Sequence, residues 1–460
     1  MCGIFFCYTK DTKIIEKYKN NKEILISEIM SRGPDHLGEV IDKNILAAHT
    51  LLSITGYKEQ PVQNDRYITL FNGEIYNDYM GYNEKYSDTE FLQNFIDKKG
   101  LQNFDELEGE YAIVVYDKKE NSITLATDTF NTKPLYYQIT ESAILIATFE
   151  EIVKKFELGN SPIRRVPVNK IITFDLKDLT VKSFKEIFQF DFGKQNKNSF
   201  EDWNIALEKS ILRRTQNTKH PLFLPLSSGH DSGLIASEML RLDIPFRAYC
   251  FFEGEDQKTL QDRIRVLSKK GVPVNVLEPS DHEIERSKLD LLANVEMIEF
   301  KNNLTPTKTF PITDFRLIDG TLCANILCKA ARQAGELIGL FGNGGDEIYS
   351  DFYYPPPSNN GWSNVAGDWY SQVGPWPNFQ GGWNEIFLKA SDRICSHNSV
   401  EGRFPLLDRW VVQEFLYLHP RLKSINYKAP LTNKLIENNF PLFNGKFGFS
   451  GIKRKQKNQL

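Results

Sequence analysis

The sequence predicts two domains of different fold class, an α+β domain with antiparallel sheets followed by an α/β domain with a parallel sheet. Length is the first observation, because 460 residues are too many for one ordinary hydrophobic core. The second is a change of pattern along the chain. Short β-rich runs separated by polar turns fill residues 1–185, whereas helical patterns alternate with short apolar runs over residues 200–460.

The composition is that of an ordinary globular protein and excludes several classes of function. Hydrophobic residues make up 41% of the chain, and the net charge of -4 argues against a surface for nucleic acid or anionic membrane. No apolar run approaches the ~18 residues of a membrane span, and no secretory signal is recognisable. The six cysteines lack the spacing of a disulfide framework or a zinc site. We therefore expect a cytoplasmic protein that binds neither nucleic acid nor membrane.

Cys2 is the most informative residue at the start of the chain. Removal of Met1 would leave a cysteine whose free α-amine can act as the base for its own thiol. The amine titrates near pH ~8 and the thiol near ~8.5, so proton transfer between them costs little. This arrangement suits acyl transfer from an amide. The alternative is that Cys2 is only a small buried hydrophobic residue.

Six β-rich runs in the first half are each expected to form a strand. They cover residues 4–8, 67–71, 111–116, 123–127, 143–148 and 170–175. Asn72 and Gly73 directly follow the second run and offer a side-chain amide and an unobstructed backbone N–H, the donors that hold an oxyanion. A hairpin turn is the commoner meaning of Asn-Gly. Ser87 and Glu90 have the spacing of a capping box, which predicts the start of a helix.

The second half begins with an apolar strand over residues 221–226, followed by a loop of Ser and Gly over 227–233 and then a helix. Backbone N–H groups at such a helix N-terminus cradle phosphate oxygens. Asp231 within the loop would repel phosphate unless Mg²⁺ lies between them. The alternative is a plain strand-to-helix turn.

The first half resembles the class II glutamine amidotransferase domain, in the arrangement found in asparagine synthetases. The matching segments are residues 1–4, 32–35, 49–54, 72–77, 87–90, 107–112 and 133–137. The resemblance implies a four-layer αββα fold of the N-terminal nucleophile type, over residues 1–185. It also implies Cys2 as nucleophile, Asn72 and Gly73 as oxyanion hole, and a glutamine site completed by Ile54, Glu74 and Asp88, with Asp88 anchoring the α-amine.

Leu51 departs from that family, which has at this position an arginine that grips the glutamine α-carboxylate. Hydrogen bonds to a charged group are worth ~1.5–3 kcal/mol, so the loss would weaken glutamine binding by one to two orders of magnitude. We expect another cation to substitute, with Arg32 and Arg66 as candidates. The alternatives are a different amide donor or free ammonia.

The second half resembles the ATP-dependent domain of asparagine synthetases, over residues 200–460. Residues 227–233 are similar to the pyrophosphate-binding motif of ATP pyrophosphatase-type synthetases, and residues 340–349 are similar to a further loop of the family. Residues 399–408 are similar to a third segment, which we interpret as structural, with an Arg–carboxylate network. The resemblance implies a parallel-sheet fold like that of adenine nucleotide α-hydrolases, and cleavage of ATP between the α and β phosphates. The implied ATP site comprises Leu226, Ser227, Ser228, Gly229, Asp231, Ser232 and Gly342. Asp231 and Asp346 are the implied Mg²⁺ ligands, and Lys446 is the implied residue that stabilises charge on the adenylate and pyrophosphate.

Two features leave the acceptor open. Asn343 stands where the family has a glutamate, and it cannot accept a proton at neutral pH. Four tryptophans spaced seven apart, Trp362, Trp369, Trp376 and Trp383, lie among Pro and Gly residues that forbid one continuous helix. They are either a packed loop with chance spacing or an aromatic wall beside the acceptor pocket.

The sequence therefore predicts a glutamine-dependent ligase with ATP and Mg²⁺ as cofactors. Ammonia released at Cys2 would pass through an internal channel, as in the family, and convert an adenylated carboxylate into an amide. Aspartate is the default acceptor, and a sugar, peptide or natural-product carboxylate is the alternative. An alternative of another class is a non-catalytic sensor that binds nucleotide or amide. A homodimer is left open.

Overall fold

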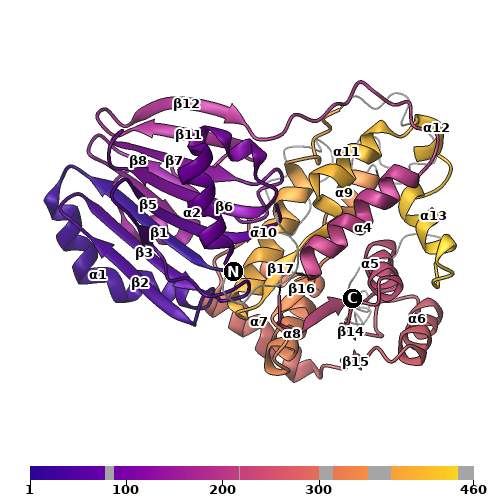
Figure 1. The fold of residues 1–460 in the computed structure, drawn as a ribbon. Coiled ribbons are helices and arrows are strands. Elements are labelled where there is room, and N and C mark those ends of the chain that lie inside the picture. The colour runs from indigo at the N-terminus through magenta and orange to yellow at the C-terminus, as the bar shows by residue number, and fades with distance from the viewer. Residues whose placement is uncertain (78–86, 217, 300–313, 351–373, 444–460) are drawn as a thin grey trace, which may run out of the picture. The chain divides into compact units, whose positions relative to one another are not determined.

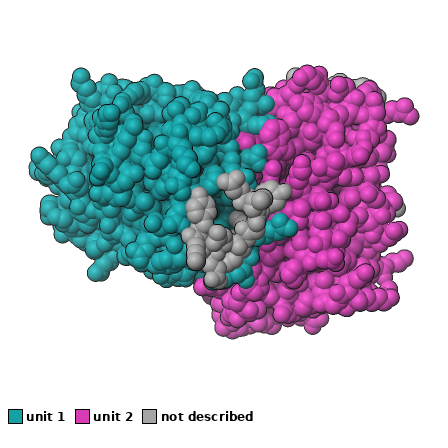
Figure 2. All heavy atoms as spheres, in the orientation of Figure 1, with its two compact units in different colours: residues 1–189, 216–219, 396–401 teal, residues 190–215, 220–395, 402–460 magenta. Residues whose placement is uncertain are grey.

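The computed structural model describes residues 1–77, 87–216, 218–299, 314–350 and 374–443 (Figure 1). Its contacts divide the chain into two compact units, coloured separately in Figure 2. The first unit comprises residues 1–189, 216–219 and 396–401, and the second comprises residues 190–215, 220–395 and 402–460.

The first unit contains two six-stranded antiparallel sheets. The first sheet has the order β10-β8-β9-β1-β3-β2 and the second the order β12-β11-β7-β6-β5-β4. Their bounds are β1 (Gly3–Thr9), β2 (His36–Ile41), β3 (Ile45–Leu51), β4 (Val62–Gln63), β5 (Tyr67–Ile75), β6 (Gly109–Asp117), β7 (Ser122–Thr127), β8 (Tyr136–Ile139), β9 (Ala143–Ala147), β10 (Arg164–Arg165), β11 (Lys170–Asp175) and β12 (Thr180–Glu186). All six strands expected from the sequence are confirmed, as β1, β5, β6, β7, β9 and β11.

Three hydrophobic clusters order the layers of this unit. One cluster joins the facing sides of the two sheets and includes Ile4 and Phe6 of β1 with Leu70 of β5. A second packs α1 (Thr12–Met30) and α3 (Glu150–Phe156) against the first sheet, and a third packs α2 (Asp88–Lys99) and the 3₁₀ helix η1 (Leu101–Glu106) against the second. The order is therefore helix, sheet, sheet, helix.

The second unit is built on a five-stranded sheet with the order β15-β14-β13-β16-β17. Its strands are β13 (Leu222–Pro225), β14 (Arg247–Cys250), β15 (Val274–Val276), β16 (Ile338–Leu340) and β17 (Glu401–Arg403). β13 pairs in parallel with both β14 and β16, so the change from antiparallel to parallel sheets is confirmed. β13 and β16 are neighbours, so the loops that leave their carboxyl ends lie side by side.

The remaining helices follow residue 200 along the chain (Figure 1). They are α4 (Glu201–Thr215), α5 (His230–Arg241), α6 (Gln257–Lys269), α7 (Asp281–Asn294), η2 (Phe315–Leu317), α8 (Asp319–Gln333), α9 (Gly345–Tyr349), α10 (Gly382–His397), η3 (Pro405–Leu407), α11 (Arg409–Tyr417), α12 (Pro420–Lys423) and α13 (Ala429–Glu437). None of the helices within the described residues combines the length and the apolar character that crossing a membrane requires.

Candidate active sites

Cys2 directly precedes β1 and is almost fully buried. Its backbone N–H donates to Asn72 Oδ1 over 2.7 Å, and its carbonyl oxygen accepts from Nε of the buried Arg32 over 2.8 Å. Met1 precedes it, and the Met1 amine lies 3.3 Å from Glu401 Oε2. The backbone of the predicted nucleophile is therefore fixed on both sides by side chains from distant parts of the chain.

Asn72 and Gly73 lie inside β5, paired with β6, so the hairpin-turn alternative is wrong for them. The Asn72 side chain is fully buried, and among the described residues its Nδ2 has no hydrogen-bond partner. Gly73 has φ of 128°, and a Cβ there would overlap the carbonyl oxygen of Glu110. A buried amide donor left without an acceptor beside a thiol is the geometry that an oxyanion hole needs.

A small cavity joins Cys2 to the predicted glutamine site. It has a volume of about 20 Å³, which is room for about one water molecule, so binding of glutamine requires lining side chains to move. Five of the predicted residues line it, namely Cys2, Ile54, Gly73, Glu74 and Asp88. Asn72 does not line the cavity but contacts Cys2 through the hydrogen bond from the Cys2 nitrogen.

Three carboxylates line this cavity, from Glu74, Asp88 and Glu401. Asp88 is the first residue of α2, whose N-cap is Ser87 in the capping box that the sequence predicted. Thr55 Oγ1 donates to Glu74 Oε2 over 2.5 Å, which fixes that carboxylate at the rim. The excess of negative charge suits a cationic group such as an α-ammonium.

The Cys2 thiol needs a base. Burial raises its pKa to about 11, so the thiol is protonated at neutral pH while Met1 remains attached. Removal of Met1 would turn the Cys2 nitrogen that now donates to Asn72 into a free α-amine. This amine belongs to the same residue as the sulfur.

Arg32 and Arg66, the candidates to replace the missing arginine, are both engaged with other groups. Arg32 donates to the Cys2 carbonyl and stacks on Phe149 at 5.0 Å. Arg66 pairs with Asp117 over 2.8 Å, beside the Tyr67 end of β5, whereas Gly73 is near the other end. Neither arginine lines the cavity, so the structure supports neither of these two candidates. The cavity is instead lined by Lys58, which sequence reasoning missed.

The predicted phosphate loop runs from β13 into α5 and is internally bonded. Leu226 is buried and donates its backbone N–H to Tyr249, Gly229 N donates to Ser227 Oγ over 3.2 Å, and the hydroxyls of Ser227 and Ser232 lie 2.8 Å apart. Ser228 N donates to Glu255 Oε2 over 2.7 Å.

Arg263 supports this loop from α6 and was not foreseen. Its Nη1 donates to the carbonyl oxygens of Ser227 and Gly229, over 2.5 and 2.7 Å. Burial lowers its pKa to about 10, which still leaves the guanidinium charged at neutral pH. The loop carbonyls therefore point inward to a fixed cation, and Gly229 caps α5 without a side-chain acceptor for the first-turn N–H groups.

Asp231 and Asp346 meet around one buried cation, Lys428. Lys428 Nζ lies 2.6 and 2.7 Å from the two Asp231 oxygens and 2.8 Å from Asp346 Oδ1. The Tyr427 hydroxyl also donates to Asp346 Oδ1 over 2.8 Å. Gly342 allows the approach, because a Cβ there would overlap Asp231. The two predicted carboxylates are thus brought together, and sequence reasoning missed Tyr427 and Lys428.

The two carboxylates are a donor set that fits Mg²⁺ bound together with ATP. Mg²⁺ in such sites takes one or two protein carboxylates and completes its shell with water and phosphate oxygens. No cluster of three or more His, Cys, Asp or Glu side chains able to hold a metal occurs in the described part of the chain. A metal at Asp231 and Asp346 would therefore depend on oxygens of the nucleotide.

Asn343 follows Gly342 and bonds to a neutral partner. Its Nδ2 donates to Ser391 Oγ over 3.1 Å, and that hydroxyl lies 3.3 Å from Asn343 Oδ1. Nearby in α9, burial and the neighbouring Asp346 raise the pKa of Glu347. Position 343 thus carries a neutral amide, and Glu347 is a buried carboxyl whose pKa is raised.

Several predicted features fall outside or apart from these sites. Lys446, Trp362 and Trp369 lie outside the described residues. Trp376 and Trp383 are both buried, and Trp376 Nε1 donates to the Glu347 carbonyl over 2.7 Å, which places this ring behind the Asp346 loop.

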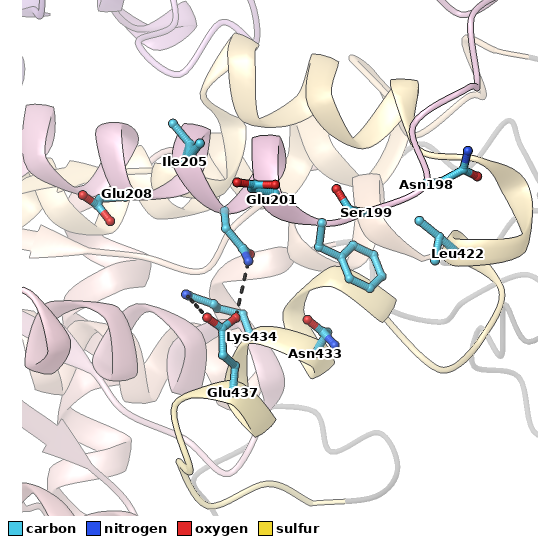
Figure 3. A pocket seen from close by; sticks show the side chains of 11 residues that line it. Asn198, Ser199, Glu201, Ile205, Glu208, Leu422, Asn433, Lys434 and Glu437 are labelled. Carbon is cyan, nitrogen blue, oxygen red and sulfur yellow. Dashed lines mark hydrogen bonds and ion pairs between the residues drawn. The ribbon is translucent and has the colours of Figure 1, made fainter.

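A second cavity, of about 560 Å³, is shown in Figure 3 and contains none of the predicted site residues. It lies between α4 and α13. The carboxylates of Glu201, Glu208 and Glu437 border it, and Lys434 bonds to Glu437.

Comparison with known proteins defines the class of the first unit. Residues 1–209 match a family described as glutamine amidotransferase domain.

Relatives of the whole chain are named as asparagine synthetases. A probable asparagine synthetase [glutamine-hydrolyzing] of Acanthamoeba polyphaga mimivirus is 25% identical over 95% of this chain and 81% of the relative. A putative asparagine synthetase [glutamine-hydrolyzing] 1 of Methanocaldococcus jannaschii is 27% identical over 94% and 83%. Asparagine synthetase B [glutamine-hydrolyzing] of Escherichia coli is 27% identical over 52% and 44%. The resemblance to the asparagine synthetase family is confirmed, and with it the class of enzyme, a glutamine-dependent ligase.

Among solved structures, the match to a glutamine phosphoribosylpyrophosphate amidotransferase from B. subtilis covers 74% of this chain and 82% of that structure's chain. The identity is 14% and the TM-score 0.32.

Proposed function

We propose that this chain is a glutamine-dependent amidotransferase that activates a carboxylate with ATP and converts it into an amide, with aspartate as the acceptor. The observation that carries the proposal is the buried Nδ2 of Asn72, which has no partner within the described part of the chain, while its Oδ1 accepts from the nitrogen of Cys2. A structural cysteine has no use for such a donor, whereas an attacking thiolate needs one for the oxyanion that it creates.

The first half-reaction follows from these groups. The α-amine of Cys2, freed by removal of Met1, takes the thiol proton, and the sulfur attacks the carboxamide carbon of glutamine. Asn72 Nδ2 and the Gly73 N–H stabilise the oxyanion. The C–N bond breaks, the amine returns its proton to the leaving nitrogen, and ammonia departs. Water then hydrolyses the thioester to glutamate. Asp88 and Glu74 hold the α-ammonium of the substrate.

The second half-reaction belongs to the residues of the parallel sheet. An acceptor carboxylate oxygen attacks the α-phosphorus of ATP. The bond between the α and β phosphates breaks, and pyrophosphate leaves. Ammonia attacks the acyl carbon and AMP departs. The first-turn N–H groups of α5, which have no side-chain cap, bind the pyrophosphate. Mg²⁺, when bound, neutralises phosphate charge beside Asp231 and Asp346, and Lys446 is proposed to stabilise the departing pyrophosphate.

A different carboxylate is the second candidate for the acceptor, and Asn343 favours it. The hydrogen bonds between Asn343 and Ser391 give this position a neutral donor and acceptor where a proton-accepting carboxylate is expected. An acceptor that hydrogen-bonds to a neutral amide fits this pair as well as aspartate does.

Pyrophosphate release decides between the enzyme and the non-catalytic sensor. Purified protein with Mg-ATP and ammonium would be supplied in turn with aspartate, sugar acids and short peptides, and the AMP and pyrophosphate formed would be measured. We expect stoichiometric AMP and pyrophosphate with aspartate. Turnover with another carboxylate alone would identify the second candidate, and binding of ATP without any turnover would contradict both.

A further inference from the structure

The charges of the Cys2 cavity are unbalanced for the substrate proposed to bind there. Glutamine carries an α-ammonium and an α-carboxylate, and the cavity offers the carboxylates of Glu74, Asp88 and Glu401 to the ammonium. Leu51, which lines the same cavity and is buried, offers only hydrocarbon to the α-carboxylate. Among the described residues that line the cavity, Lys58 is the one with a cationic side chain.

The loop that carries Lys58 is held against the N-terminus of α2. Ser53 N donates to Asp35 Oδ2 over 2.8 Å, and Gly56 packs so closely on Ser87 that a Cβ there would lie 3.0 Å from the Ser87 Cα. At the other end of the loop, the amide of Gln60 donates to Thr89 Oγ1 over 3.1 Å. The backbone on both sides of Lys58 is therefore fixed beside the first turn of the helix.

Lys58 is available to a ligand because its own ion pair is weak. Its Nζ lies 3.9 Å from Glu90 Oε1, and the two side chains are 41% and 35% exposed. A pair with this separation and exposure contributes little to stability. Glu90 is also engaged by the capping box, where its Oε2 accepts from Ser87 N over 3.1 Å. Lys58 therefore loses little when it turns towards an anion in the cavity.

The stereochemistry of an amino acid favours this position. The α-ammonium and the α-carboxylate share one carbon, so the groups that bind them must lie close together. Lys58 and Asp88 both line the cavity, so the Lys58 ammonium and the residue proposed to hold the α-ammonium border the same space. A carboxylate next to the helix N-terminus is further stabilised by the helix dipole.

We propose that Lys58 binds the α-carboxylate of glutamine and determines the preference of the cavity for a substrate with a free carboxylate. The inference rests on the glutamine hydrolysis proposed above. A lysine ammonium is a point charge on a flexible stem, without the bidentate fork of a guanidinium. Binding of glutamine should therefore weaken with increasing salt, because the partly exposed contact is screened.

The test compares two substrates that differ only at the α-carboxylate. Ammonia release from glutamine and from its α-amide, in which a neutral carboxamide replaces the carboxylate, would be measured for the wild type and Lys58→Met. We expect kcat/KM for glutamine to fall about 10- to 100-fold, through KM, with kcat nearly unchanged. The value for the α-amide should change by less than about threefold, and Lys58→Arg should restore the preference for glutamine.

Lys170→Met is the matched control, since Lys170 is also a partly exposed lysine paired with a glutamate, 2.9 Å from Glu186, and does not line the cavity. Equal losses on both substrates, or no loss on either, would overturn the role of Lys58 while leaving glutamine hydrolysis intact. A wild-type protein that hydrolyses neither substrate, although correctly folded and freed of Met1, would overturn the proposed function and this inference together.

Discussion

Removal of the Lys428 ammonium should destabilise the second unit in a way that Mg²⁺ reverses. Lys428 Nζ is 2.6 Å from Asp231 Oδ1 and 2.8 Å from Asp346 Oδ1, so these two oxygens are at most 2.6 + 2.8 = 5.4 Å apart. In Lys428→Met the two carboxylates face one another without a cation between them. At that separation and an effective dielectric constant of ~20, their repulsion is about 3 kcal/mol.

The assay is thermal unfolding of the full chain in EDTA and in Mg²⁺. For a unit of this size, about 3 kcal/mol corresponds to a fall in Tm of roughly 6–12 °C. We expect the fall in EDTA and recovery of at least half of it in Mg²⁺, because a divalent cation can take the place of the ammonium between the carboxylates.

Lys434→Met is the control for this experiment. Lys434 is a buried lysine within α13, the helix that Lys428 caps, but it pairs with Glu437 over 3.2 Å and Glu238 over 3.9 Å. Its loss should lower Tm with no recovery in Mg²⁺. If both variants respond to Mg²⁺ alike, or if Lys428→Met is as stable as the wild type in EDTA, the account of these two carboxylates is wrong.

Three further predictions concern single residues. Cys2→Ala should abolish glutamine-dependent amide formation and leave ammonia-dependent formation within about twofold, measured as AMP produced with either nitrogen source; equal loss with both would show a structural role. Asn72→Ala should lower kcat for glutamine hydrolysis about 10²- to 10³-fold, as loss of one oxyanion donor does elsewhere, and a change confined to KM would contradict it. Burial lowers the pKa of Lys423 to about 7 from an unfolded value near 10, so the unfolded chain holds the extra proton between these values and stability rises with pH. From pH 7 to 9 the gain should be about 2 kcal/mol in urea unfolding, and Lys423→Met should lack it.

The sequence predicted those parts of the structure that depend on local pattern. The strands of the first unit follow from short β-rich runs bounded by turns, and the start of α2 from the spacing of Ser87 and Glu90. The meeting of Asp231 and Asp346 follows from two loops at the ends of parallel strands. Within residues 399–408, for which an Arg–carboxylate network was expected, Asp408 pairs with an arginine from outside the segment, Arg214, at 3.0 Å.

The partners of the charged groups could not be predicted, because each is brought in by tertiary structure. Lys428 reaches Asp231 across 197 positions of the chain, and Glu401 reaches the Met1 amine across 400. Lys58 lies in a loop without periodicity, and only the packing of that loop on α2 brings it to the cavity. The sequence could identify the missing arginine at Leu51, yet the side chain near enough to replace it depends on the fold.

Transfer of labelled nitrogen tests the central claim most directly. Protein freed of Met1 would be incubated with Mg-ATP, aspartate and glutamine carrying ¹⁵N in its side-chain amide, and the products analysed by mass spectrometry. The account predicts asparagine with ¹⁵N in its amide and one AMP for each asparagine formed. Release of the label only as free ammonia, with no AMP formed from aspartate or from any other carboxylate supplied, would contradict it.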